Sequence, residues 1–200
     1  MTLAIQAGGR SSRMGRDKGL VELAGRPLVG HVIDRLGPLA DEVIITTNQP
    51  GDYAAFGLRT AGDAQPGAGA LDGLLTAIEA AQGDPVLVAA CDMPFASKAL
   101  ASHLLSLSEG AEAVVPRPGG EYEPLFAVYR RACVEPIRHA LAAGQRRVIS
   151  FFSEVNLRAV EADEIAGVDP GPWIFFNVNT PDDLAEAERH WRASGAKETA

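Results

Sequence analysis

The residues of this sequence best suited to bind an anion lie in the stretch 6–20. It reads QAGGRSSRMGRDKGL and follows a short apolar run. Gly8 and Gly9 let the backbone turn sharply, and successive N–H groups in such a turn form a concave anion site. Arg13 can hold a phosphate through two parallel hydrogen bonds, and Lys18 adds a mobile positive charge. The full stretch predicts a phosphate-binding loop, although a bare glycine pair would equally fit a solvated turn.

The loop differs from the two most familiar nucleotide-binding motifs. Gly15 is followed by Arg-Asp-Lys, so the Gly-Lys-Ser/Thr ending of a P-loop, with its hydroxyl for magnesium, is missing. The pair Gly8-Gly9 also lacks the Gly-x-Gly-x-x-Gly spacing of a dinucleotide-binding fingerprint. Phosphate binding here must therefore follow another pattern.

Asp92 stands where the apolar run 85–90 ends in Cys-Asp-Met-Pro. A carboxylate in this position is held by the sheet and faces the same crevice as the glycine loop, because open α/β sheets bind ligands at the carboxyl ends of their strands. Magnesium prefers hard oxygen ligands and completes its octahedron with water and phosphate oxygens. From the residues alone, a magnesium ligand and a capping or salt-bridged aspartate fit equally well.

The first half of the chain predicts the elements that position these residues. Solid apolar runs predict strands at 2–6, 42–47, 58–61 and 85–90, and amphipathic spacing predicts helices at 27–36, 71–82 and 97–107. Strands of this kind that alternate with helices indicate a parallel sheet covered on both faces.

The alternation of strands and helices breaks down in the second half of the chain. Strands are expected at 113–116 and 125–129, joined by a loop too short for a helical crossover, so one of them must run antiparallel. Further on we expect helices at 132–143 and 148–154, strands at 157–160 and 174–178, and a last helix from Thr180 to about Trp191 with a frayed tail from Ser194. The pattern predicts one domain over residues 1–200: a three-layer α/β/α, Rossmann-like fold whose mostly parallel sheet has an antiparallel strand in its second half.

Composition and charge narrow the function classes. The chain is 46% hydrophobic and 22% charged, the balance of a packed globule, and its net charge of -8 argues against binding to nucleic acid or anionic membranes. Residues 1–36 nevertheless carry six basic and three acidic side chains, which indicates a local pocket for an anionic ligand. We interpret the two cysteines as reduced thiols, and we find no signal sequence and no apolar run long enough to cross a bilayer. These observations lead us to expect a cytoplasmic protein.

The string Ala-Gly-Gly-x-Ser-x-Arg-Met-Gly-x-Asp-Lys-x-Leu over residues 7–20 resembles the signature loop of the MobA-like nucleotidyltransferases. The Cys-Asp-x-Pro step at Asp92, the Glu123-Pro124-Leu-Phe string and the Asn-x-Asn-Thr-Pro-Asp-Asp-Leu string from Asn177 are similar to further family motifs. The resemblance extends over residues 3–184. The chain departs from the family pattern at Gln6, where the family often has an apolar leucine, and in the turn 69–73.

The resemblance implies a Mg²⁺-dependent enzyme of the family's guanylyltransferase branch, which transfers GMP from GTP to molybdopterin or its molybdenum-bearing form. It assigns catalytic roles to Arg13 and Lys18 on the departing pyrophosphate and to Asp92 as the metal ligand. The nucleotide-binding residues that it implies are Gln6, Ala7, Gly8, Gly9, Lys18, Asn48, Asp63 and Asp92. The implied acceptor-binding residues, in the second half of the domain, are Glu123, Pro124, Asn177 and Asn179.

Two alternatives remain open. One is a CTP-dependent cytidylyltransferase of the same fold that acts on molybdopterin or another phosphorylated small molecule. The other is a non-catalytic nucleotide-binding domain that kept the loop. For Asn177 and Asn179, organising the turn before the last helix fits at least as well as binding a substrate. Beyond its substrates, the partners expected are other cofactor-biosynthesis proteins and acceptor molybdoenzymes, with no nucleic acid and no membrane.

Overall fold

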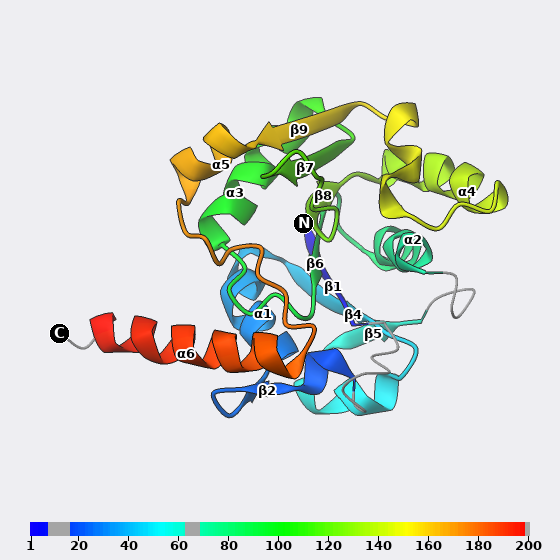
Figure 1. Ribbon diagram of the computed structural model, residues 1–200. Coiled ribbons are helices and arrows are strands. Elements are labelled where there is room, and N and C mark those ends of the chain that lie inside the picture. Colours follow the sequence, from blue (N-terminus) through cyan, green and yellow to red (C-terminus); the bar gives the residue numbers. More distant parts are fainter. Residues whose placement is uncertain (8–16, 63–68, 199–200) are drawn as a thin grey trace.

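The computed structural model describes residues 1–7, 17–62 and 69–198 (Figure 1). Within these residues seven strands form one sheet in the order β5-β4-β1-β6-β8-β7-β9. Their bounds are β1 Thr2–Gln6, β4 Glu42–Thr46, β5 Arg59–Ala61, β6 Val86–Ala90, β7 Ala113–Arg117, β8 Phe126–Tyr129 and β9 Leu157–Glu161. Each lies within about a residue or two of an expected strand.

The strand directions match the expected mixed sheet. β5, β4, β1 and β6 are parallel to one another, and β7 is parallel to β9. β8 runs antiparallel to both of its neighbours, β6 and β7. The link between β7 and β8 has no helix, so β8 can only return antiparallel beside β7. Placing β1 between β4 and β6 brings the ends of the most apolar strands together at the centre of the sheet.

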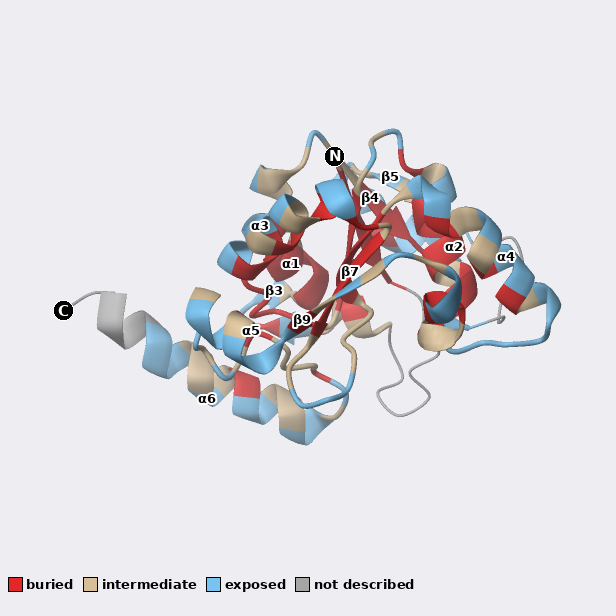
Figure 2. Ribbon diagram, turned by 90° about the horizontal axis from the view of Figure 1, so that it is seen from above, coloured by how far each residue is buried: buried red, intermediate tan, exposed pale blue. Residues whose placement is uncertain are grey.

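Helices cover both faces of the sheet, as expected for three layers (Figures 1 and 2). One face carries α1 Leu28–Leu36, α3 Lys98–Ser106 and α5 Ala162–Val168, and the other carries α2 Ala70–Ala80 and α4 Val134–Ala142. Alternate residues of the strands enter the two cores: Leu3 and Ile5 pack in the first, and Ala4 packs in the second. No helix in the described ranges combines the length and apolar character needed to cross a membrane.

Short elements complete the connections. A two-stranded hairpin pairs β2 Glu22–Leu23 with β3 Arg26–Pro27, and the sequence did not predict it. The 3₁₀ turns are η1 Lys18–Leu20, η2 Gly37–Leu39, η3 Pro50–Phe56, η4 Leu107–Gly110, η5 Arg131–Cys133 and η6 Val148–Glu154. The stretch 148–154, expected as a helix, is thus a 3₁₀ helix, and the seven-residue α5 was not expected.

The strand predicted at 174–178 is wrong. This segment runs as an irregular chain that turns through a hydrogen bond from the Phe176 N–H to the Trp173 carbonyl. Two of its apolar side chains are still buried: Ile174 packs in the core with α1 and α3, and Val178 packs with the last helix. The apolar residues of this stretch therefore predicted correctly that part of it is buried. They did not predict that, within the described residues, it pairs with none of the strands of the sheet.

The last helix, α6, spans Pro181–Glu198 and so continues beyond the end predicted at Trp191. Its start is the predicted one: the Thr180 hydroxyl accepts from the Asp183 N–H at 3.1 Å, and the Asp183 carboxylate accepts from the Thr180 N–H at 2.8 Å. Leu184, Ala187 and Trp191 pack against Leu23, Leu28 and Phe95. These contacts fix the segment before the helix against the rest of the fold.

Candidate active site

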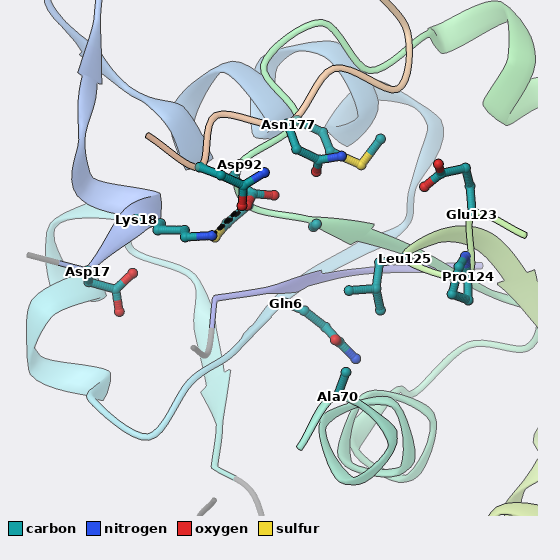
Figure 3. Close-up of a pocket in the computed structure, with 13 residues that line it drawn as sticks. Gln6, Asp17, Lys18, Ala70, Asp92, Glu123, Pro124, Leu125 and Asn177 are labelled. Atoms are coloured by element: carbon teal, nitrogen blue, oxygen red, sulfur yellow. Dashed lines mark hydrogen bonds and ion pairs between the residues drawn. The ribbon is translucent and has the colours of Figure 1, made fainter. Parts of the chain in front are cut away.

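A pocket of about 410 Å³ opens at the carboxyl ends of β1 and β6 (Figure 3). The two strands are neighbours with Gln6 opposite Ala90, so the end of one and the turn after the other share this edge. The lining residues are Gln6, Asp17, Lys18, Ala70, Ala90, Cys91, Asp92, Met93, Glu123, Pro124, Leu125, Asn177 and Asn179. This is the edge at which open α/β sheets bind their ligands.

Lys18 reaches into the pocket from η1. Its Nζ donates a hydrogen bond of 2.5 Å to Oδ1 of Asn179 and lies 3.6 Å from Oδ2 of Asp92. The turn that carries it is capped by Asp17, whose carboxylate accepts from the Gly19 N–H at 3.0 Å. A Cβ at Gly19 would come within 2.6 Å of the Tyr53 hydroxyl, so only glycine fits after this lysine. The ammonium group is therefore held by backbone geometry as well as by its partners.

Asp92 follows β6, and only 14% of its side chain is exposed. Burial raises the pKa of Asp92, whereas the neighbouring Lys18 lowers it; burial outweighs the lysine. The Asp92 carbonyl accepts a hydrogen bond of 2.9 Å from the Val178 N–H. The segment before α6 is thus fixed directly to the turn after β6, and this bond brings Asn177 and Asn179 to the pocket.

Gln6 ends β1, and only 8% of the residue is exposed. Its backbone carbonyl accepts from the Cys91 N–H at 3.0 Å, but its side-chain Nε2 is buried without a hydrogen-bond partner in the described part of the chain. Figure 3 shows the side chain extending toward Ala70 at the start of α2. Ala7 follows in the same strand direction, is buried, and bonds through its N–H to the Thr46 carbonyl at 2.9 Å.

The opposite wall comes from the segment before β8. Burial raises the pKa of the Glu123 carboxyl, which faces the pocket (Figure 3). The Pro124 carbonyl is held by the hydroxyl of the fully buried Tyr129 at 2.8 Å. Asn177 donates from Nδ2 to the Phe175 carbonyl at 3.0 Å. This wall offers polar groups but no cation of its own among the described residues that line the pocket.

The structure brings together seven of the residues predicted for the site: Gln6, Lys18, Asp92, Glu123, Pro124, Asn177 and Asn179. Asn48 is exposed at the end of β4, beside Gly62, and does not line the pocket. Gly8, Gly9, Arg13 and Asp63 lie outside the described residues. The sequence analysis missed Asp17 and Tyr53 as the groups that hold the lysine turn. An Asp two residues before a glycine could have signalled the first, whereas the second is distant in sequence.

No three histidine, cysteine or carboxylate side chains of the described residues gather into a metal site formed by protein alone. Magnesium, however, is commonly bound through one or two carboxylates, with phosphate and water oxygens as its remaining ligands. Asp92 meets that requirement because it is a partly buried hard-oxygen ligand next to a cation that can bind phosphate. The donor set present fits such an ion together with a phosphorylated ligand.

A mostly parallel sheet covered by helices on both faces, with a lysine–aspartate pair at the edge where its central strands end, defines a doubly wound α/β protein. The model of the MobA-like NTP transferase domain matches residues 3–159. The chain therefore belongs to the MobA-like NTP transferase family.

Curated relatives and solved structures agree with this assignment. The chain is 40% identical over 194 residues to a probable molybdenum cofactor guanylyltransferase of Pelotomaculum thermopropionicum, covering 93% of this chain and 91% of the relative. It is 36% identical to the molybdenum cofactor guanylyltransferase of Pseudomonas putida, covering 92% and 96% of the two chains. The crystal structure of molybdopterin-guanine dinucleotide biosynthesis protein A from Archaeoglobus fulgidus is similar with a TM-score of 0.83 and 26% identity, covering 96% of this chain and all of that one.

Proposed function

We propose that this protein transfers GMP from GTP to the phosphate of molybdopterin, with or without bound molybdenum, and releases pyrophosphate. The observation that carries the proposal is the Lys18–Asp92 pair at the centre of the pocket. Its support comes from relatives named molybdenum cofactor guanylyltransferase, which match the chain over more than nine-tenths of its length. In this proposal the first half of the domain binds the nucleotide and the second half binds the acceptor.

The reaction is a displacement at phosphorus. An oxygen of the acceptor phosphate attacks the α-phosphorus of GTP, a new P–O bond forms, and the bond between the α-phosphorus and the bridging oxygen breaks as pyrophosphate leaves. The attacking phosphate is ionised near neutral pH, because a phosphomonoester loses its second proton near pH 6, so no general base is required. Such transfers depend mainly on positioning and on neutralisation of charge.

The residues proposed for the site can supply both requirements. Lys18 stabilises negative charge that develops on the departing pyrophosphate, and Arg13 is proposed to assist it. Asp92 would hold Mg²⁺, which neutralises phosphate charge when bound. Glu123, Pro124, Asn177 and Asn179, which all line the pocket, are proposed for the acceptor. Asn48 and Asp63, which follow β4 and β5 in the sequence, are proposed to contact the nucleotide.

The test is pyrophosphate release by the purified protein with Mg²⁺, molybdopterin and each nucleoside triphosphate in turn. We expect turnover with GTP far above that with CTP. Asp92→Asn should lower turnover by about 100-fold or more while much of the nucleotide affinity remains, because the carboxylate acts on charge rather than on the base. The exposed Asp163→Asn is the matched control and should behave as wild type.

Two outcomes would contradict the proposal. Faster turnover with CTP than with GTP would make the protein a cytidylyltransferase. Binding of GTP without any turnover in the presence of molybdopterin would make it a nucleotide-binding module.

A further inference from the structure

Glu123 brings a carboxyl group to the pocket that no described side chain or backbone group binds. The residue is half-buried, lines the pocket, and its carboxyl faces the open space (Figure 3). Burial raises the pKa of this carboxyl, and no hydrogen bond or positive charge from another described residue offsets the burial. A carboxylate that loses water without gaining a partner costs free energy. The carboxyl of Glu123 is therefore poised for a donor that a ligand supplies.

The backbone around this carboxyl is fixed. The Glu123 N–H donates to the Pro116 carbonyl at 2.9 Å, and the Glu123 carbonyl accepts from the Phe126 N–H at 3.1 Å. The next carbonyl, that of Pro124, accepts from the hydroxyl of Tyr129 at 2.8 Å. The link between β7 and β8 thus holds the residue in place while its carboxyl remains available, which is the arrangement of a preorganised binding group.

The carboxyl lies away from the charged part of the pocket. Lys18 and Asp92 are 3.6 Å apart, and Figure 3 shows Glu123 across the pocket from this pair. Lys18 lowers the pKa of Asp92 but contributes nothing to that of Glu123. A carboxylate without a cation nearby repels phosphate. The part of the pocket beside Glu123 therefore suits an uncharged group that donates hydrogen bonds.

The lining beside Glu123 is apolar. Met93, Pro124 and Leu125 also line the pocket, and Met93 is almost completely buried. Sites of this kind hold a flat ring through apolar contacts, and a few polar groups fix its orientation. An ionised carboxylate has two oxygens that accept hydrogen bonds and no donor. The matching ring edge carries two N–H donors side by side.

We propose that the Glu123 carboxylate accepts two hydrogen bonds from the pterin ring of the acceptor, one from the 2-amino group and one from N3–H. The proposal rests on the proposed function, since it takes molybdopterin as the acceptor. Molybdopterin carries its phosphate at the end opposite this edge of the ring, so a molecule with its phosphate near Lys18 and Asp92 extends its ring toward Glu123. Glu123 then determines specificity, because a ring with a carbonyl at position 2 would set an oxygen against the carboxylate.

Equilibrium dialysis at pH 7 tests the ring contact with two probes, pterin and lumazine. They differ at position 2, where pterin has an amino group and lumazine a carbonyl. Mg²⁺ and saturating α,β-methylene-GTP keep both rings out of the nucleotide part of the site. Wild type should bind pterin about 10-fold or more tightly than lumazine, because one charged hydrogen bond is replaced by a repulsion.

Glu123→Gln should reverse this preference. The glutamine amide can donate to the carbonyl of lumazine and accept from its N3–H, whereas against pterin its NH₂ group faces a second donor. The exposed Glu121→Gln, on the same loop, is the matched control and should keep the wild-type preference.

Steady-state pyrophosphate release measures the same contact on the whole substrate. Glu123→Gln should raise the KM for molybdopterin about 10- to 100-fold, the effect of losing hydrogen bonds to a charged group. The kcat and the KM for GTP should stay within about twofold of wild type, because the carboxylate binds the ring and does not touch the reacting phosphorus. A thermal melt without ligand checks for a structural role: the melting temperature of the variant should equal or exceed that of wild type.

Several results would overturn the proposal and leave the proposed function intact, provided that wild type turns over. They are an unchanged KM for molybdopterin in Glu123→Gln, a variant that still prefers pterin, and a wild type that binds both rings equally or neither. A raised KM for GTP would place the carboxylate on the nucleotide instead, and a lowered melting temperature with an unchanged ring preference would make its role structural. A wild-type protein without turnover on molybdopterin would overturn both.

Discussion

The hydroxyl of Tyr53 donates a hydrogen bond of 2.6 Å to Oδ1 of Asp17, the residue immediately before Lys18. The same oxygen accepts from the Gly19 N–H, so one carboxylate links η3 to both ends of the lysine turn. Tyr53 is fully buried, and its burial raises the pKa of its hydroxyl well above the ordinary value, so the group stays a donor. The position of the Lys18 backbone is thus fixed by a residue that does not line the pocket.

Tyr53→Phe should therefore weaken both the stability of the fold and catalysis. Loss of one buried hydrogen bond costs about 1 kcal/mol of stability, and the freer lysine turn should lower kcat about 3- to 10-fold. The measurements are steady-state pyrophosphate release and urea unfolding. Tyr122→Phe, on a segment away from the lysine turn, is the control. Unchanged kcat in Tyr53→Phe would show that the turn holds its position without this hydroxyl.

Asn179 accepts a hydrogen bond from Lys18. Substitution of Asn179 should therefore change how the positive charge of Lys18 is held in the site. Asn179→Ala removes the acceptor but keeps the backbone N–H that bonds to Asp183, so the start of α6 should remain intact. We expect a loss of activity of a few fold, about that of one hydrogen bond. Asn179→Asp should be worse, by about 10-fold or more, because a second carboxylate near Asp92 repels phosphate. Equal activity of the two variants would contradict this electrostatic argument.

Glu42 gives the stability a defined dependence on pH. Burial alone would raise the pKa of this carboxyl. Hydrogen bonds from Arg59, the Gln82 N–H and Thr2 together lower the pKa by more than burial raises it, so the net pKa is below the ordinary 4.5. A carboxyl with a lowered pKa stabilises the fold above its unfolded-state pKa, and this contribution is lost as the pH falls from about 4.5 through the folded-state pKa.

Glu42→Gln should thus lower the free energy of unfolding at pH 7 by about 1–2 kcal/mol. The difference from wild type should shrink as the pH falls below about 4.5. Urea unfolding of both proteins at pH 7 and at acidic pH measures it, with the exposed Glu22→Gln as control. A difference that stays constant with pH would mean that the hydrogen bonds do not depend on the ionised carboxylate.

Phe95 anchors α6 through an aromatic cluster. Its ring lies 4.9 Å from the His190 ring, 5.5 Å from the Trp173 ring and 6.3 Å from the Trp191 ring, measured between centroids. Phe95→Ala should cost about 3–5 kcal/mol of stability and change the fluorescence of both tryptophans, because it leaves a cavity under the helix. Phe95→Leu should cost clearly less. Comparable losses in the two variants would show that volume is not the deciding quantity.

Much of the site could be predicted because its position follows from strand ends. Gln6 and Asp92 each end a solid apolar run, and parallel strands deliver such residues to one edge of the sheet. The 174–178 segment could not be predicted, since burial and strand pairing look alike in a short apolar run and only the fold decides which occurs. The contact between Lys18 and Asn179 joins residues 161 positions apart, and no local pattern encodes it.

The Val178 N–H bonded to the Asp92 carbonyl has a consequence for biosynthesis. Lys18, Asp92 and Asn179 are translated in that order and far apart, yet all three meet at one point. A nascent chain that has emerged through β6 contains Lys18 but still lacks the wall that residues 177–179 supply. The pocket is therefore complete only after residues 177–179 have left the ribosome.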